Sequence, residues 1–255
     1  MKKFLKTNKK SFWLYGKHTC ISALKNKNRR CLKLLMTHNF YKRNKKEIDQ
    51  YINKKNVEAE LIRNKVLDNT LPIYVNHQGI ALKVLPIFQN LNIENIANSN
   101  NNSTLVILDQ ITDINNIGSI LRTSVCFNVD AIVLPCNHSP NENASIAKVA
   151  SGALDMIPLI RVTNIVKTMK YLKKLGYWCY GFDNSTTKKY INEINNFEKK
   201  IAIIFGSEEK GMRQLVKKSC DYLVKIPISN TINSLNISNA VAIGLFYIYQ
   251  SIIKT

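Results

Sequence analysis

The feature that most constrains the fold is an alternation of short apolar runs with segments of helical spacing over residues 104–253. Apolar runs occur at 104–109, 129–135, 156–162, 177–183, 200–206 and 222–228, and helical spacing occurs from about 117, at 142–150, at 164–174 and at 235–253. Strands that are apolar throughout are buried on both faces, and alternating helices supply the cover. The sequence therefore predicts an α/β domain with a mostly parallel sheet.

The glycine signatures of common nucleotide-binding sheets are missing from this segment. None of the nine glycines forms G-x-G-x-x-G, and no G-x-x-x-x-G-K-[ST] occurs. These patterns bring the backbone close to phosphates in dinucleotide-binding and P-loop enzymes. A generic Rossmann oxidoreductase is therefore the least favoured interpretation.

The positive charge is concentrated before the α/β segment. The net charge is +20, and residues 1–97 hold 20 Lys and Arg against 6 Asp and Glu, whereas 98–255 hold 17 against 11. A lysine-rich coding bias would spread the charge evenly, so the local excess favours a phosphate-binding surface. The polar stretch 97–103 is interpreted as a linker. We predict a basic, phosphate-binding domain over 1–96 and a second domain over 104–255.

Cysteine spacing and hydropathy suggest neither a metal site nor a membrane anchor. The six cysteines form no C-x-x-C pair and no ligand cluster with the four histidines. No stretch approaches the roughly 20 apolar residues of a membrane span. Residues 1–16 are basic but lack the apolar core of a signal peptide. We expect a cytoplasmic protein, although these first residues also fit an organelle transit peptide.

The stretch "DINNIGSILR" (113–122) places polar turn residues before a helix that carries one arginine. Asp and Asn cap helices and bond their own backbone in turns. Arg122 lies one turn beyond Gly118, and helical side chains lean toward the N-terminus, so its guanidinium is expected over the turn 115–118. A surface arginine paired with Asp113 or another carboxylate is the simpler alternative.

Two later loops also carry polar residues after apolar runs. In "FGSEEKGM" (205–212), Gly206 ends a run and Glu208 follows it. Ligands bind at the carboxyl ends of strands in open α/β sheets, but an ordinary strand-to-helix connection fits this loop equally well. In "IPISNTINSLNISNA" (226–240), four polar residues crowd a helix start where one would suffice as a cap: Ser234, Asn236, Ser238 and Asn239. This crowding indicates a hydrogen-bonding site.

In this order and at these separations, the three loops resemble the motifs of the SpoU family of RNA ribose 2'-O-methyltransferases, in the SPOUT superfamily. The matching patterns are D-x-x-N-x-G-x-x-x-R, F-G-S-E-x-x-G and I-P-I…S-L-N-I-S-N-A. The segments "LYGKHTCISAL" (14–24) and "NHQGIAL" (76–82) are similar to the substrate-binding domain of the branch that methylates guanosine in 23S rRNA. That domain resembles the kink-turn-binding ribosomal proteins.

Two positions depart from the family pattern. Ile114 stands where the first motif usually has Pro, and Ile228-Ser229-Asn230 stand where the third usually has Met-x-Gly. Proline and glycine are backbone devices. The departures therefore concern the rigidity of the loops more than their chemistry.

The resemblance implies a small α/β RNA-binding domain over 1–96, followed by an α/β sheet whose C-terminal part forms a trefoil knot. It also implies a homodimer with its active site at the subunit interface, and S-adenosylmethionine as cofactor. The residues implied to bind the cofactor are Gly206, Ile226, Ser234 and Leu235. The residues implied in catalysis are Arg122, Asn116, Glu208 and Asn236. No metal is implied.

The family proposal makes the arginine the acceptor of the ribose 2'-hydroxyl proton. A guanidinium holds its proton above about pH 12, so we expect Arg122 to grip the adjacent phosphate and stabilise the developing alkoxide. The proton then leaves through Arg122, through water, or toward Glu208. Asn116 and Asn236 are expected to orient Arg122 and the ribose.

The predicted function is methylation of a guanosine 2'-hydroxyl in 23S rRNA. A 2'-hydroxyl occurs at every nucleotide, so selectivity requires recognition of RNA shape and unpaired bases, which the basic N-terminal domain can supply. A tRNA guanosine 2'-O-methyltransferase is an alternative, although such members typically lack this domain. A non-catalytic RNA-binding protein is a second alternative, disfavoured by the intact Arg122, Glu208 and Asn236.

Overall fold

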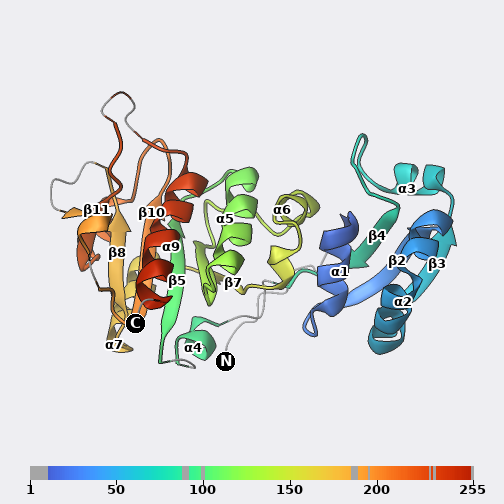
Figure 1. Ribbon diagram of the computed structural model, residues 1–255, viewed down its shortest axis with the longest axis horizontal. Coiled ribbons are helices and arrows are strands. Elements are labelled where there is room, and N and C mark those ends of the chain that lie inside the picture. The colour runs from blue at the N-terminus through green and yellow to red at the C-terminus, as the bar shows by residue number, and fades with distance from the viewer. Residues whose placement is uncertain are drawn as a thin grey trace. The chain divides into compact units, whose positions relative to one another are not determined.

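The chain divides into two compact units, each with its own sheet (Figure 1). The computed structural model describes residues 11–87, 92–98, 101–184, 189–194, 196–229, 231 and 234–253. The first unit has the bounds Met1–Gln89 and Glu142–Met156, and the second Asn90–Asn141 and Ile157–Thr255. The sequence predicted one linker at 97–103, whereas the chain passes from the first unit to the second at 89/90, residues 97–103 lie within the second unit, and residues 142–156 pack with the first unit.

The first unit is a small α/β domain, as predicted. Its four-stranded sheet has the order β1 (Phe12–Tyr15), β4 (Ile80–Val84), β2 (Cys31–Thr37) and β3 (Glu58–Ile62). Strand β4 is antiparallel to β1 and β2, and β3 is parallel to β2. The helices are α1 (Lys17–Lys25), α2 (His38–Lys55), α3 (Asn64–Thr70) and α6 (Ala144–Val149), followed by the 3-10 turn η2 (Ala153–Asp155).

Helices cover both faces of this sheet. Tyr15, Leu35 and Ile62 pack against Leu67 of α3 on one face. Side chains alternate along a strand, so residues such as Leu34 point to the other face. There α1 contacts β1 and β4, and α2 contacts β2 and β3.

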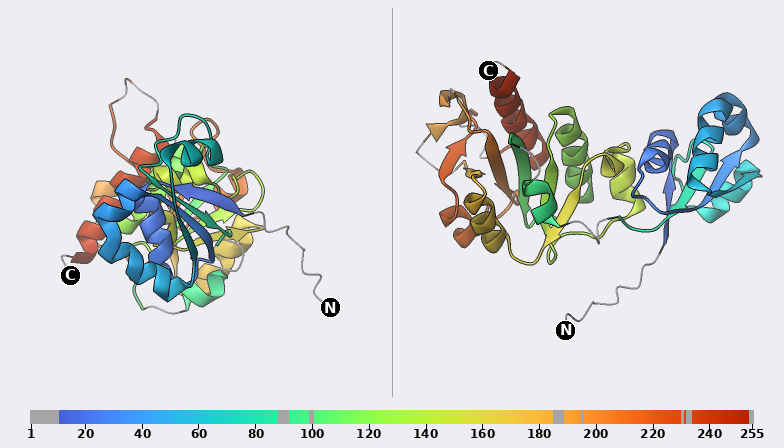
Figure 2. Two further views of the ribbon diagram at one scale, coloured as in Figure 1. Left: turned by 90° about the vertical axis from the view of Figure 1, so that its right-hand side faces the viewer. Right: turned by 90° about the horizontal axis from the view of Figure 1, so that it is seen from below.

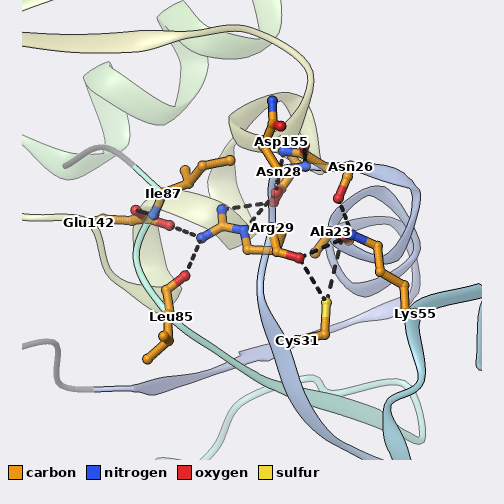
Figure 3. Close-up of polar contacts among 10 residues, drawn as sticks. All are labelled: Ala23, Asn26, Asn28, Arg29, Cys31, Lys55, Leu85, Ile87, Glu142 and Asp155. Carbon is orange, nitrogen blue, oxygen red and sulfur yellow. Dashed lines mark hydrogen bonds and ion pairs between the residues drawn. The ribbon is translucent and has the colours of Figure 1, made fainter. Parts of the chain in front are cut away.

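A buried arginine joins residues 142–156 to the rest of the first unit (Figure 3). Arg29 donates two hydrogen bonds to Asp155, from Nε (2.7 Å) and from a terminal nitrogen (3.0 Å). It also pairs with Glu142 and donates to the Leu85 carbonyl (3.1 Å). Burial alone would lower the pKa of Arg29, but the hydrogen bonds and charges of Asp155 and Glu142 outweigh it and raise the pKa. The segment 142–156 is thus held by a fully buried ion-pair cluster.

The second unit is built on a seven-stranded sheet in which every adjacent pair is parallel. The strand order is β7 (Leu159–Val162), β6 (Ala131–Pro135), β5 (Ser103–Asp109), β10 (Lys200–Gly206), β8 (Trp178–Phe182), β11 (Tyr222–Lys225) and β9 (Lys189–Tyr190). The prediction of a mostly parallel α/β sheet is confirmed.

Helices lie on both faces of this sheet too (Figure 2). They are α4 (Ile93–Ala97), α5 (Ile114–Cys126), α7 (Ile165–Lys174), α8 (Gln214–Lys218) and α9 (Ile237–Ile253), with the 3-10 turn η3 (Ile191–Glu193). Leu105, Ile107 and Ile204 pack with α4 and α7. Alternate residues such as Val106 and Phe205 face the opposite side. On that side α5 and α9 contact each other, and α9 contacts β10.

Candidate active site

Two of the three predicted loops begin side by side at one edge of the large sheet, and the third follows β11 of the same sheet. Asp109, the last residue of β5, and Gly206, the last residue of β10, are register partners. The first loop leaves β5 and the second leaves β10, so the carboxyl ends of two adjacent parallel strands deliver both. This is the edge at which open α/β sheets bind ligands.

The first loop is fixed by its own cap. Asp113 is the N-cap of α5, and its Oδ1 accepts a hydrogen bond from the Asn115 backbone N–H (2.8 Å). Ile114, which replaces the usual proline, is the first residue of the helix, where proline serves to set φ in advance. The carboxylate of Asp113 therefore holds the helix start without the proline.

A single carboxylate oxygen links the three loops. Glu208 Oε1 accepts hydrogen bonds from the side-chain amides of Asn116 (3.2 Å) and Asn236 (2.8 Å) and from the Ile237 backbone N–H (3.0 Å). The Asn116 carbonyl oxygen in turn accepts from Asn236 Nδ2 (2.9 Å). The structure thus brings together three of the four residues implied in catalysis, although they are far apart in sequence.

The side-chain amide of Asn236 forms hydrogen bonds through both its nitrogen and its oxygen. Its Nδ2 donates to Asn116 and Glu208, while its Oδ1 accepts from the Ser238 N–H (3.0 Å) and hydroxyl (2.6 Å) at the start of α9. The helix start and the network are therefore positioned by one side chain. This explains part of the crowding of polar residues in the third loop; residues 230, 232 and 233 of that loop lie outside the described part of the chain.

Sequence reasoning missed a second link between the first two loops. Asp109 is fully buried, and it accepts hydrogen bonds from the backbone N–H and Nε of Arg213, both at 2.9 Å. The ion pair fixes the chain just after the second loop to the end of β5. The available signal was a charged residue closing an otherwise apolar strand.

A cavity of about 490 Å³ lies beside this network, within the range of small-molecule sites. Its lining includes all four residues implied to bind the cofactor: Gly206, Ile226, Ser234 and Leu235. Phe182, Phe205 and Met212 add apolar surface, and Asp183 and Glu208 add carboxylates. Such a mixed lining suits a ligand that carries an aromatic base, a ribose and a positive charge.

The shape of this cavity depends on Gly206. A Cβ there would lie 2.0 Å from the carbonyl carbon of Gly211 and from the backbone nitrogen of Met212. Gly211 has φ +65°, and its N–H and C=O bond the backbone of Ser207 (2.8 and 3.2 Å). The second loop is therefore a tight turn that folds back onto the end of β10.

A second cavity of about 340 Å³ adjoins the same carboxylate. Asp113, Asn116 and His138 line it, and Ser207, Glu208 and Lys210 line both cavities. Glu208 thus lies at the boundary of two spaces. One can hold a cofactor and the other a reacting group.

Arg122 is placed differently from the other three residues. It is exposed on α5, lines neither of these cavities, and has no hydrogen bond or ion pair with another described residue. The carboxylate of Asp113 instead accepts from Asn115 and Asn116. Arg122 therefore does not form the surface pair with Asp113, or with another carboxylate of the described residues, that was the simpler alternative.

Two features are absent from the described residues. They contain no group of three or more His, Cys, Asp or Glu side chains placed to hold a metal ion. None of the helices in the described ranges is long and apolar enough to cross a membrane.

Comparisons with known proteins agree with the geometry. The SpoU rRNA methylase family matches residues 103–246, and the RNA 2'-O ribose methyltransferase substrate-binding family matches 13–88. The 23S rRNA (guanosine-2'-O-)-methyltransferase RlmB of Haemophilus ducreyi is 32% identical over 93% of this chain and 96% of its own.

Solved structures show the same fold. The SpoU methyltransferase AviRb of Streptomyces viridochromogenes, in complex with AdoMet, has a TM-score of 0.80 at 18% identity and covers 95% of this chain and 91% of its own. The TrmH/SpoU tRNA modifying enzyme of A. aeolicus has a TM-score of 0.55 at 18% identity and covers 62% of this chain and 80% of its own. The predictions of a methyltransferase and of S-adenosylmethionine as its cofactor are confirmed, and this chain belongs to the SpoU rRNA methylase family.

Proposed function

We propose that the protein methylates the ribose 2'-hydroxyl of a guanosine in 23S rRNA, with S-adenosylmethionine as methyl donor. The observation that carries the proposal is the network in which Glu208, Asn116 and Asn236 join three separate loops at the boundary of two cavities. We further propose that the C-terminal part of the second unit forms the trefoil knot of the SPOUT superfamily. The enzyme would act in the cytoplasm.

The larger of the two active-site cavities fits the cofactor. Phe205, Ile226 and Leu235 can hold the adenine between apolar side chains and backbone, and the carboxylate of Glu208 faces the same space. When bound, S-adenosylmethionine supplies an electrophilic methyl carbon on a positively charged sulfur. The chain's own task is then to orient the ribose hydroxyl and to accept its proton.

Glu208 is the best placed proton acceptor within one chain. Its Oε1 is occupied by three N–H donors, whereas its Oε2 has no hydrogen bond with another described residue. Asn116 and Asn236 thus fix the carboxylate through one oxygen and leave the other available. With S-adenosylmethionine bound as the methyl donor, Glu208 would accept the proton that the 2'-hydroxyl loses, on Oε2 directly or through one water.

Arg122 contributes from a neighbouring subunit in this proposal. It lies on the exposed side of α5, beside α9, whose residues Phe246 and Ile253 are 50% and 64% exposed. These two side chains lie seven residues apart on one side of α9, and an exposed apolar surface of this kind suits a homodimer interface. Across such an interface, the guanidinium can bind the phosphate beside the target ribose and stabilise the alkoxide.

Mixed dimers test this arrangement. Arg122→Ala and Glu208→Ala chains are each expected to be inactive alone. If the site combines Arg122 of one subunit with Glu208 of another, randomly mixed dimers regain about a quarter of wild-type turnover, because half of them carry one intact site. Mixtures that stay inactive, despite subunit exchange verified by tagged chains, would mean that both residues act from the same chain.

Two substrate classes are candidates, rRNA and tRNA. Support for rRNA comes from the RlmB enzyme of Haemophilus ducreyi, which matches 93% of this chain, whereas the A. aeolicus tRNA modifying enzyme covers 62% of it. A domain match to RNA 2'-O ribose methyltransferase substrate binding spans residues 13–88. A tRNA substrate remains the second candidate on account of that same relative.

The deciding experiment uses tritiated S-adenosylmethionine with unmodified 23S rRNA and, separately, unmodified tRNA. Alkaline cleavage is blocked next to a 2'-O-methyl group, so it maps the modified nucleotide. Label at one rRNA guanosine that is lost with Glu208→Ala supports the proposal. Label in tRNA alone would mean that tRNA, not rRNA, is the substrate. Binding of RNA with no label, either in naked rRNA or in rRNA of assembling ribosomes, would point to a non-catalytic protein.

A further inference from the structure

Two sequence segments of the first unit have no role in the methyl-transfer site, and they meet at a separate cavity. The segments are 14–24 and 76–82, and the cavity has a volume of about 800 Å³. Lys17 and Gln78 line it, together with residues from the starts of α2 and α3. The cavity lies within the first unit and is distinct from the two at the edge of the large sheet.

The wall formed by residues 77–79 is held in an uncommon backbone conformation. Gln78 and Gly79 have φ of +56° and +81°, and the Gly79 N–H donates to His77 Nδ1 (3.0 Å). The other ring nitrogen of the buried His77 bonds Asp68 (3.0 Å), which fixes the ring. A Cβ on Gly79 would lie 2.6 Å from the Thr37 hydroxyl oxygen, so the turn lies directly against the start of α2.

Gln78 connects this turn to the start of α1. Its Oε1 accepts a hydrogen bond from the Lys17 backbone N–H (2.9 Å). Its Nε2 has no hydrogen-bond partner among the described residues. The rigid turn thus offers an amide donor at the cavity rather than a flexible side chain.

The cavity is strongly cationic. Lys17, Arg43 and Arg63 line it, and none of the described lining residues is acidic. None of these three cations forms an ion pair with another described residue, whereas Lys33 in the same unit pairs with two glutamates. The side-chain amides of Asn39 and Asn64 also line the space. Unpaired arginines suit phosphate oxygens, and amides suit the edges of bases.

An exposed aromatic side chain lies on the loop that leads into this wall. Tyr74 is fully exposed with φ +64°, and its neighbour Ile73 is 79% exposed. Figure 1 shows the loop between α3 and β4 projecting from the unit. An aromatic ring without packing partners is a surface on which an unpaired base can stack.

We propose that this cavity binds a single-stranded segment of the RNA substrate, with Arg43 and Arg63 on backbone phosphates, the amides on the edge of an unpaired base, and Tyr74 as a stacking platform. The inference rests on the proposed function for the identity of the substrate as RNA. It adds where on the protein the RNA binds and that the bound RNA is single-stranded. Single-stranded RNA offers base edges that an A-form helix hides.

The test measures the affinity of the full chain for an unmodified 23S rRNA transcript at several salt concentrations. Arg43→Gln/Arg63→Gln is compared with the control Lys46→Gln/Lys65→Gln, which removes the same charge from α2 and α3 outside the cavity. Two lost phosphate contacts are expected to reduce the slope of log affinity against log salt by about 1.4, and to lower affinity about tenfold. The control should change affinity less than about threefold.

Tyr74→Ala tests the stacking contact without changing the charge of the protein. It is expected to lower affinity at least about fivefold without changing the salt slope, because stacking releases no counterions. Arg43→Lys/Arg63→Lys should keep most of the slope and lose part of the affinity, since a lysine cannot form a fork. Thermal unfolding of each variant establishes that the exposed substitutions leave the fold intact.

Equal losses in the cavity variant and the control would overturn the proposal, as would a Tyr74→Ala chain that binds like wild type. The binding assay involves no methyl transfer, so it separates the two proposals. A wild-type chain that binds rRNA but never methylates it would refute the proposed function alone. A wild-type chain that methylates rRNA, with a cavity variant indistinguishable from the control, would refute the cavity alone.

Discussion

Replacing Arg29 by methionine is expected to lower the free energy of unfolding of the first unit by about 3–5 kcal/mol, the range for removing one partner of a buried ion pair. The side chains of Arg29, Glu142 and Asp155 are 0%, 2% and 0% exposed. Methionine leaves both carboxylates buried without their cation. Asp155 keeps a hydrogen bond from Asn26 (3.0 Å) and Glu142 keeps one from the Ile87 N–H (2.7 Å), which stabilise the charges only in part. The upper half of the range is therefore expected.

The two tryptophans allow each unit to be followed separately. Trp13 lies on β1 of the first unit and Trp178 on β8 of the second. Urea unfolding in a Trp178→Phe background reports the first unit, which matters because a two-unit chain need not unfold in one step. With a slope of about 2 kcal/mol per molar urea, a loss of 4 kcal/mol moves the midpoint by about 2 M. Arg30→Met, at the exposed neighbouring position, is the control.

The pH dependence, and a variant that also lacks the two carboxylates, test this prediction further. The folded pKa of Arg29 is raised, so its contribution is complete below the unfolded pKa and is lost only as pH rises through the folded pKa. The contribution of Arg29 to the wild-type protein should therefore be constant between about pH 6 and pH 9, whereas in Arg29→Met the buried carboxylates lose their cation and bind protons more readily, so the shift should shrink as pH falls. Replacing Glu142 and Asp155 by leucine as well should recover more than half of the loss. An unchanged Trp13 midpoint, or the same shift for Arg30→Met, would refute the reasoning.

Three further predictions concern the second unit. Glu208→Gln keeps a carbonyl acceptor but not a proton acceptor, so turnover should fall at least about a hundredfold while calorimetric affinity for S-adenosylmethionine changes less than about threefold; near-normal turnover would reduce Glu208 to a positioning residue. Gly206→Ala forces a Cβ within 2.0 Å of backbone atoms, so cofactor affinity should fall at least about tenfold in the same titration, and unchanged affinity would contradict the proposed cofactor site. Burial raises the pKa of Cys179 to about 12, so a thiol reagent followed by mass spectrometry should label the exposed Cys126 and Cys136 first and Cys179 only on unfolding; equal labelling rates in the native protein would contradict this burial.

The large sheet was predictable because its strands are continuously apolar. Strands β5 and β10 begin and end within one residue of the predicted runs, since a strand buried on both faces leaves no polar residue to obscure it. Strand β3 was missed, because four of its five residues are exposed and no alternation remains. Helix α4 was missed as well; it ends at buried Ala97, the residue that was interpreted as the start of the polar stretch.

The membership of the active site was more predictable than its geometry. The ordered loops indicated that Asn116, Glu208 and Asn236 meet, and the hydrogen bonds between them agree with that expectation. The sequence could not indicate that one oxygen of Glu208 takes three donors, because that depends on how strand ends and a helix start are placed in space. The same limit applies to Arg122, whose helical position is evident but whose partner is not among the described residues of its own chain.

The boundary between the two units at 141/142 cannot be predicted from the sequence, and the contacts of Arg29 and Arg161 show why. Arg161 donates to the Cys136 carbonyl (2.6 Å) and to Asn141 Oδ1 (2.8 Å), so it fixes the loop that carries His138 of the smaller active-site cavity. The next residue, Glu142, belongs to the first unit and pairs with Arg29, 113 residues earlier in the chain. Neither arginine belongs to a sequence motif. Each makes its contacts with residues that come together only in the folded chain. The chain therefore passes from the second unit to the first at 141/142 between two residues that are each fixed within their own unit, whereas the polar stretch 97–103 lies inside the second unit.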